Sequence, residues 1–65
     1  MKEKYIGIIE IDDNVITIVK RGNVLIGGGA TNCGLAESYK MEIDECFSLD
    51  ENLQQFIEQV EKEIE

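Results

Sequence analysis

The chain has 65 residues, of which 14 are acidic and 6 are basic, so its formal net charge at pH 7 is −8. This charge disfavours direct binding to a nucleic-acid backbone or to a membrane, because both reward clustered Lys and Arg side chains. The apolar fraction of 43% is that of an ordinary folded domain, and no apolar run approaches the roughly 20 residues that span a bilayer. The composition predicts one folded domain over residues 1–65 and permits a basic protein as partner.

A chain this short rarely builds a core that leaves more than about 3–5 kcal/mol of net stability, so additional support is expected. The start of the sequence has no apolar leader, and its two cysteines, Cys33 and Cys46, are expected to be small, reduced, buried residues of a cytoplasmic protein. Without histidine or a short Cys-x-x-Cys pair, the sequence predicts no metal site and no cofactor. Association with another chain is the remaining source of support.

Two aliphatic segments near the N-terminus, residues 4–11 and 15–20, predict a pair of strands. Asp12-Asp13-Asn14 lies between them, and because these residue types favour tight turns, the two segments are expected to form a hairpin. The same three side chains carry oxygen atoms that could hold a cation. The turn is the stronger interpretation, because the spacing of a calcium-binding loop is absent.

Two further strands are expected, over residues 23–30 and 35–44. Gly22 is expected to adopt a positive φ in the turn that leads to the first of them. A second turn centred on Asn32-Cys33 sets the register between the two strands. In this register the opposed pairs are Val24 with Met41, Ile26 with Tyr39, and Ala30 with Leu35.

The segment 49–64 predicts an amphipathic helix, because its apolar residues recur at helical spacing on one stripe. Ser48 and Glu51 have the spacing of a capping box, in which each side chain bonds the backbone amide of the other residue. The stripe consists of Leu49, Leu53, Phe56, Ile57, Val60 and Ile64. The chain is therefore expected to have an α+β fold, a small antiparallel β-meander of about four strands packed by one C-terminal amphipathic helix.

The first three strands carry aliphatic residues on both faces, whereas one helix covers only one face of a sheet. We expect a homodimer or a higher oligomer, formed through the second face or through the edge of the first strand. The alternative is that the sheet curls and buries part of both faces itself. The residues expected at this interface are Tyr5, Ile6 and Ile8.

Gly27, Gly28 and Gly29 interrupt a strand, which indicates a close approach by another group. Phe56 or Leu53 of the helix is one candidate for that group. A small anionic ligand is the other, because backbone amides in glycine-rich turns can bind anions. The motif of a nucleotide-binding loop is absent. The residues of this ligand site would be Gly27, Gly28, Gly29, Thr31 and Asn32.

An acidic band surrounds the start of the helix and continues along its exposed side. A solvated surface is one interpretation of the band; a negative surface that meets a basic partner is the other. Catalysis by paired carboxylates is disfavoured, because a chain of this size offers little pocket to separate their pKa values. The band comprises Glu42, Asp44, Glu45, Asp50, Glu51, Glu58, Glu61, Glu63 and Glu65, of which Glu51, Glu58 and Glu61 are the candidate partner contacts.

Together these features predict a small acidic non-enzymatic binding protein. It would act as a homo-oligomer that occupies or sequesters a protein partner, as a phage-type accessory inhibitor does. Two alternatives stay open. One is an oligomeric protein that sequesters a nucleotide or another anionic metabolite in the loop 27–32, and the other is a structural assembly subunit.

Overall fold

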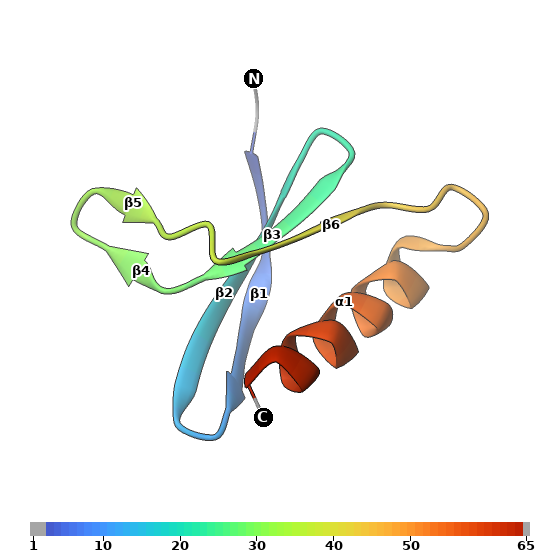
Figure 1. Ribbon diagram of the computed structural model, residues 1–65. Coiled ribbons are helices and arrows are strands. Elements are labelled where there is room, and N and C mark those ends of the chain that lie inside the picture. Colours follow the sequence, from blue (N-terminus) through green and yellow to red (C-terminus); the bar gives the residue numbers. More distant parts are fainter. Residues whose placement is uncertain (1–2, 65) are drawn as a thin grey trace.

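The computed structural model describes residues 3–64, with the backbone alone described at residues 30 and 31. Within this range the chain forms strands and one helix in the order β1 (Glu3–Ile11), β2 (Asn14–Arg21), β3 (Val24–Gly28), β4 (Ala30–Thr31), β5 (Gly34–Leu35), β6 (Tyr39–Glu42) and α1 (Leu49–Ile64). An antiparallel sheet has the strand order β1-β2-β3-β6, and α1 packs against one of its faces (Figure 1). The predicted α+β fold, a four-stranded meander with one C-terminal helix, is confirmed.

The first hairpin turn has the geometry that its residues favour. Asp12 and Asp13 have φ angles of 48° and 68°. Two positive φ angles in a two-residue loop are typical of the type I′ turn, whose twist matches that of the strands it joins. Asn14 Nδ2 of the side chain donates to the Asp12 carbonyl oxygen at 3.2 Å. The next turn uses Gly22 with φ 62°, as the sequence predicts.

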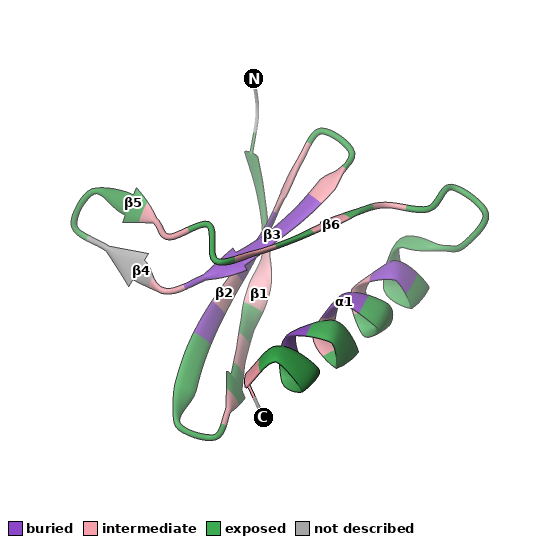
Figure 2. Cartoon of the chain, in the orientation of Figure 1, coloured by how far each residue is buried: buried purple, intermediate pink, exposed green. Residues whose placement is uncertain are grey.

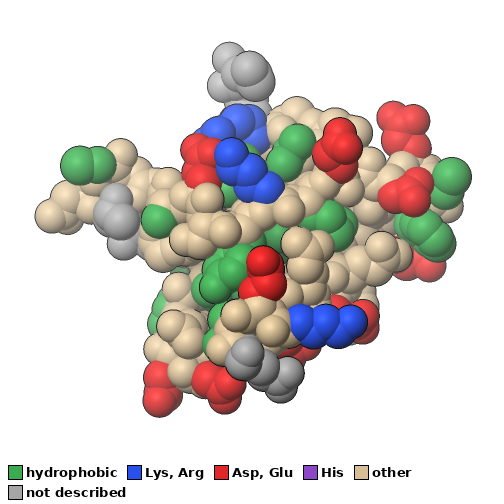
Figure 3. All heavy atoms as spheres, viewed as in Figure 1, with side chains coloured by type: hydrophobic (Ala, Val, Ile, Leu, Met, Phe, Trp, Pro, Cys, Tyr) green, Lys and Arg blue, Asp and Glu red, His purple; other side chains and the backbone are tan. Residues whose placement is uncertain are grey.

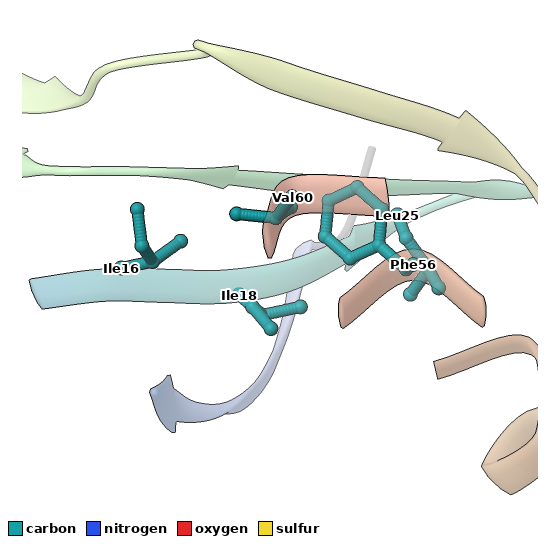
Figure 4. Close-up of a cluster of buried hydrophobic side chains, with 5 residues drawn as sticks. All are labelled: Ile16, Ile18, Leu25, Phe56 and Val60. Atoms are coloured by element: carbon teal, nitrogen blue, oxygen red, sulfur yellow. The ribbon is translucent and has the colours of Figure 1, made fainter. Parts of the chain in front are cut away.

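The core lies between the sheet and α1 (Figures 2 and 4). It is formed by Ile16 and Ile18 of β2, Leu25 of β3, and Phe56 and Val60 of α1. Figure 2 shows the buried positions of α1 along the side that faces the sheet. The helical stripe is therefore as predicted in its centre, whereas Leu49 at its start is 37% exposed.

The capping box at the start of α1 is confirmed. The Ser48 amide donates to Glu51 Oε1 at 3.0 Å, and the Glu51 amide donates to Ser48 Oγ at 3.2 Å. These bonds satisfy amide groups that have no partner within the helix itself. The helix consequently begins at the residue that its sequence specifies.

Continuous strands over residues 23–30 and 35–44 are a wrong prediction, because both segments are interrupted. Beyond the sheet, β4 and β5 form a separate two-stranded hairpin that projects from it (Figure 1). Between the sheet and this hairpin, residues 36–38 stand opposite Gly28 and Gly29, so one side of the pairing has an extra residue. Such an insertion is a β-bulge, which bends the strand that contains it.

The bulge explains a one-residue error in the expected register. Ala30 lies opposite Leu35, as expected, because this pair is on the turn side of the extra residue. On the other side of it, Ile26 lies opposite Lys40 rather than Tyr39. Tyr39 instead lies opposite Gly27.

Candidate functional site

The glycine run is approached closely by the chain itself. A Cβ atom on Gly27 would lie 3.2 Å from ring atoms of Phe56 and from Ile16 Cγ2. A Cβ on Gly28 would lie 1.7 Å from the carbonyl oxygen of Ala36, whereas a Cβ on Gly29 would meet nothing within 4 Å. The expectation that the helix covers these glycines is confirmed at Gly27, through Phe56.

The residues of the expected ligand loop are distributed over different surroundings. Gly27 and Gly28 are buried, and Asn32 is exposed in the turn between β4 and β5. The side chain of Thr31 lies outside the described part of the structure. No pocket is found among residues 3–64. The ligand role of this loop stays a prediction.

The bulged segment 36–38 is fixed by ion pairs as well as by backbone bonds. Arg21 Nη1 lies 3.0 Å from Glu37 Oε2, and Lys40 Nζ lies 3.0 Å from Glu37 Oε1. The other nitrogens of the Arg21 guanidinium bond Glu3 at the start of β1. The hydrogen bonds from Lys40 and Arg21 hold the pKa of Glu37 below its ordinary value of 4.5. The hydrogen bonds that Arg21 donates to Glu3 and Glu37 raise the pKa of Arg21.

The lowered pKa of Glu37 predicts a pH-dependent contribution to stability. A carboxyl group whose pKa is lower in the folded state stabilises that state above its unfolded pKa, and this contribution disappears as the pH falls through the folded pKa. Glu37→Gln should therefore melt at a lower temperature than wild type at pH 7, by a small amount because the group is exposed. The difference should shrink as the pH falls below 4.5 and vanish below the lowered folded-state pKa, where wild-type Glu37 is protonated. A difference that is equal at pH 7 and pH 3 would contradict this linkage.

Asn52 fixes the connection between β6 and α1. Its side chain is fully buried, and Asn52 Oδ1 accepts from the Asp44 amide at 2.7 Å. Asn52 Nδ2 donates to three carbonyl oxygens, those of Asp44 at 2.9 Å, Phe47 at 3.3 Å and Ser48 at 2.8 Å. One amide thus holds three residues of a connection that has no regular secondary structure.

This connection and the first two residues of α1 present apolar side chains among carboxylates. Phe47 is 45% exposed and Leu49 is 37% exposed, and Asp44, Glu45 and Asp50 are exposed beside them in sequence. In Figure 3, apolar atoms border carboxylates at the end of the molecule where β6 leads into α1. We call these five residues the acidic connection.

The interface residues predicted from the sequence lie outside the acidic connection, on α1 and β1. Glu58 and Glu61 are exposed along α1, whereas Glu51 is engaged in the capping box. Tyr5 and Ile8 are 62% and 57% exposed on β1. Ile6 is partly buried and packs against the core, because the register shifts between Tyr5 and Gly7.

Both cysteines are exposed, which corrects the expectation that they are buried. Cys33 lies in the turn between β4 and β5, and Cys46 lies in the turn between β6 and α1. Their small apolar side chains do not reach the core, because each turn projects from it (Figure 1).

The roles of Asn52 and Phe47 are not among the expectations from the sequence. Asn52 precedes Phe56 by four residues and Val60 by eight, and this spacing places it on the buried side of the helix. A polar residue at a buried helical position indicates a structural role for its side chain. Phe47 is an aromatic residue within an acidic segment, and this pattern indicates a candidate contact residue.

Within the described residues, no helix has the length and apolar character that crossing a membrane requires, and no group of potential ligand side chains could hold a metal ion. No family model, curated protein or solved structure matches the chain.

Proposed function

We propose that this chain is a cytoplasmic, non-enzymatic binding protein that occupies a basic and partly apolar surface of another protein. The supporting observation is the exposure of Phe47 and Leu49 within the acidic connection. Binding energy at protein interfaces is concentrated in a few large side chains, often aromatic, that become buried near the centre of the contact. Phe47 is such a side chain, and the carboxylates around it favour a partner that carries Lys or Arg.

The connection is also held in one conformation before binding. Asn52 bonds the backbone at Asp44, Phe47 and Ser48. A segment that is already ordered loses less conformational entropy when it binds, and this improves affinity. Exposed Glu58 and Glu61 extend the negative surface along α1, where they would mainly accelerate association.

A displayed library of random peptides, selected on the immobilised protein, tests this proposal. The selected peptides should combine Lys or Arg with at least one apolar residue. Phe47→Ser should weaken their binding by about tenfold or more, since loss of a central anchor commonly costs more than about 1.4 kcal/mol. Glu45→Lys should also weaken binding, and its effect should diminish at high salt. Isothermal titration measures both changes.

Glu10→Lys is the matched control, because it makes the same change of charge on β1, in a different element of the fold. Its affinity for the selected peptides should stay near that of wild type. The double variant Glu58→Lys and Glu61→Lys should slow association more than it accelerates dissociation. Peptides without basic residues, or peptides that bind Phe47→Ser as well as wild type, would refute the proposed surface.

A further inference from the structure

β1 is an edge strand, because the sheet order is β1-β2-β3-β6 and β1 pairs only with β2. An edge strand presents unpaired backbone amide and carbonyl groups that can pair with another strand. The pairing of β1 with β2 is regular from Gly7 to Ile11, beyond the shift between Tyr5 and Gly7. This regular half of β1 is the part best suited to accept a further strand.

β1 carries Lys4 near its start and Glu10 near its end, and within the described residues neither is in an ion pair, whereas Glu3 pairs with Arg21. Lys4 lies directly opposite Lys20 of β2, and like charges in this position destabilise a sheet. None of the ion pairs among residues 3–64 includes Lys4. At the other end, Glu10 lies opposite Val15, and Asp12 and Asp13 follow in the turn without an ion pair in the described part of the chain.

A second copy of the same strand matches this pattern. In an antiparallel pair related by a two-fold axis, opposed residues lie at equal distances from the axis along the two strands. If the axis passes at Gly7, Lys4 lies opposite Glu10 of the partner, and if it passes at Ile8, Lys4 lies opposite Asp12. Lys4 of each β1 then meets the acidic end of the other strand, twice per dimer.

We infer that the open edge of β1 binds β1 of a second copy, which joins two sheets into one. Tyr5 and Ile8 of β1 are 62% and 57% exposed, and a second β1 at the open edge would cover part of both side chains. Side chains on an edge strand have neighbours on one side only. A paired β1 supplies neighbours on the other side, and Ile8 lies close to the axis.

This dimer is independent of the acidic connection, because that connection lies beyond β6, at the opposite edge of the sheet from β1. The dimer would therefore present two copies of the connection. Loss of one surface should leave the other intact, so that each proposal can fail separately.

Charge reversal tests the inference without a change of fold. Lys4→Glu places a carboxylate opposite Lys20 in the same chain, which favours the monomer fold, and opposite the acidic end of β1 in the partner, which disfavours the dimer. Sedimentation equilibrium over micromolar to millimolar concentrations should show a dimer for wild type. Lys4→Glu and Glu10→Lys should each raise the dimer dissociation constant at least tenfold.

Variants that restore opposite charges at the two ends of β1 show whether the charge pairing itself causes dimerisation. The double variant Lys4→Glu with Glu10→Lys again carries opposite charges at the two ends of β1, so it should dimerise as wild type does. An equimolar mixture of the two single variants should form heterodimers, because each chain then meets its opposite charge at both ends. Phe47→Ser should dimerise normally.

Val15→Ser distinguishes edge pairing from packing of the exposed sheet faces. Val15 is exposed on β2, away from the edge. Its substitution should leave the dimer unchanged, and a dimer lost in this variant would instead place the interface on the sheet face and overturn the inference. A monomeric wild type at millimolar concentration, or single charge variants that dimerise like wild type, would also overturn it.

Discussion

Gly28→Ala is expected to lower the melting temperature by about 10 °C or more, or to prevent folding. The added Cβ would lie 1.7 Å from the carbonyl oxygen of Ala36, which belongs to the backbone and cannot rotate away. To relieve this overlap, residues 36–38 must move and lose the bonds from the Ala36 amide to the Gly29 oxygen and from the Ser38 amide to the Gly27 oxygen. Overpacking typically costs about 1–3 kcal/mol, and for a domain of this size 1 kcal/mol corresponds to about 4–8 °C.

Neighbouring glycines supply matched controls for this substitution. A Cβ on Gly29 meets no atom within 4 Å, so Gly29→Ala should melt within a few degrees of wild type. Gly27→Ala should fall between the two, because its contacts at 3.2 Å are with the side chains of Phe56 and Ile16, which can shift slightly. Thermal denaturation followed by circular dichroism gives the order of the three melting temperatures. If Gly28→Ala is as stable as Gly29→Ala, the backbone of residues 36–38 does not approach Gly28 closely.

The features that the sequence alone predicts correctly are those with local causes. Asp12 and Asp13 favour a tight turn by their own side-chain chemistry, and the turn forms at these residues. The capping box requires only Ser48 and Glu51, three residues apart. The meander and its helix follow from such local signals together with the periodicity of the apolar residues.

The register of the last two strands could not be predicted in the same way. Alternation of apolar and polar residues shows which side chains share a face, but it does not reveal where one strand contains an extra residue. That residue lies in the segment 36–38, and its place depends on the absence of side chains at Gly28. The glycine run indicates a close approach by a helix or a ligand, whereas at Gly28 the group that approaches is a backbone carbonyl from the adjacent segment.

The acidic part of the candidate site was evident from the sequence, whereas its apolar centre was not. Carboxylates are usually exposed, so the band could be identified from composition alone. An aromatic residue such as Phe47 is commonly buried, and its exposure here depends on the course of the connection between β6 and α1. That course is set by hydrogen bonds from Asn52, eight residues from Asp44 and five from Phe47.

Asn52→Ala is expected to destabilise the protein by about 2–3 kcal/mol, a large part of the stability of so small a domain. The substitution removes four hydrogen bonds to the backbone of the connection and leaves a gap at a fully buried position. A polar group that loses its partner away from water costs about 1–3 kcal/mol. Urea denaturation should show the loss as a lower midpoint with little change in slope.

Gln55→Ala is the control, because Gln55 carries an amide on the exposed side of the same helix and should change stability by less than about 0.5 kcal/mol. Hydrogen exchange then separates a local effect from a global one. The Asp44 amide donates to Asn52 Oδ1, so in Asn52→Ala its exchange should accelerate more than that of the amides in β2 and β3. Equal acceleration everywhere would mean that Asn52 stabilises the whole fold without ordering the connection. In that case the conformation of Phe47 would need another cause, and the proposal that an ordered connection binds a basic partner would lose its structural basis.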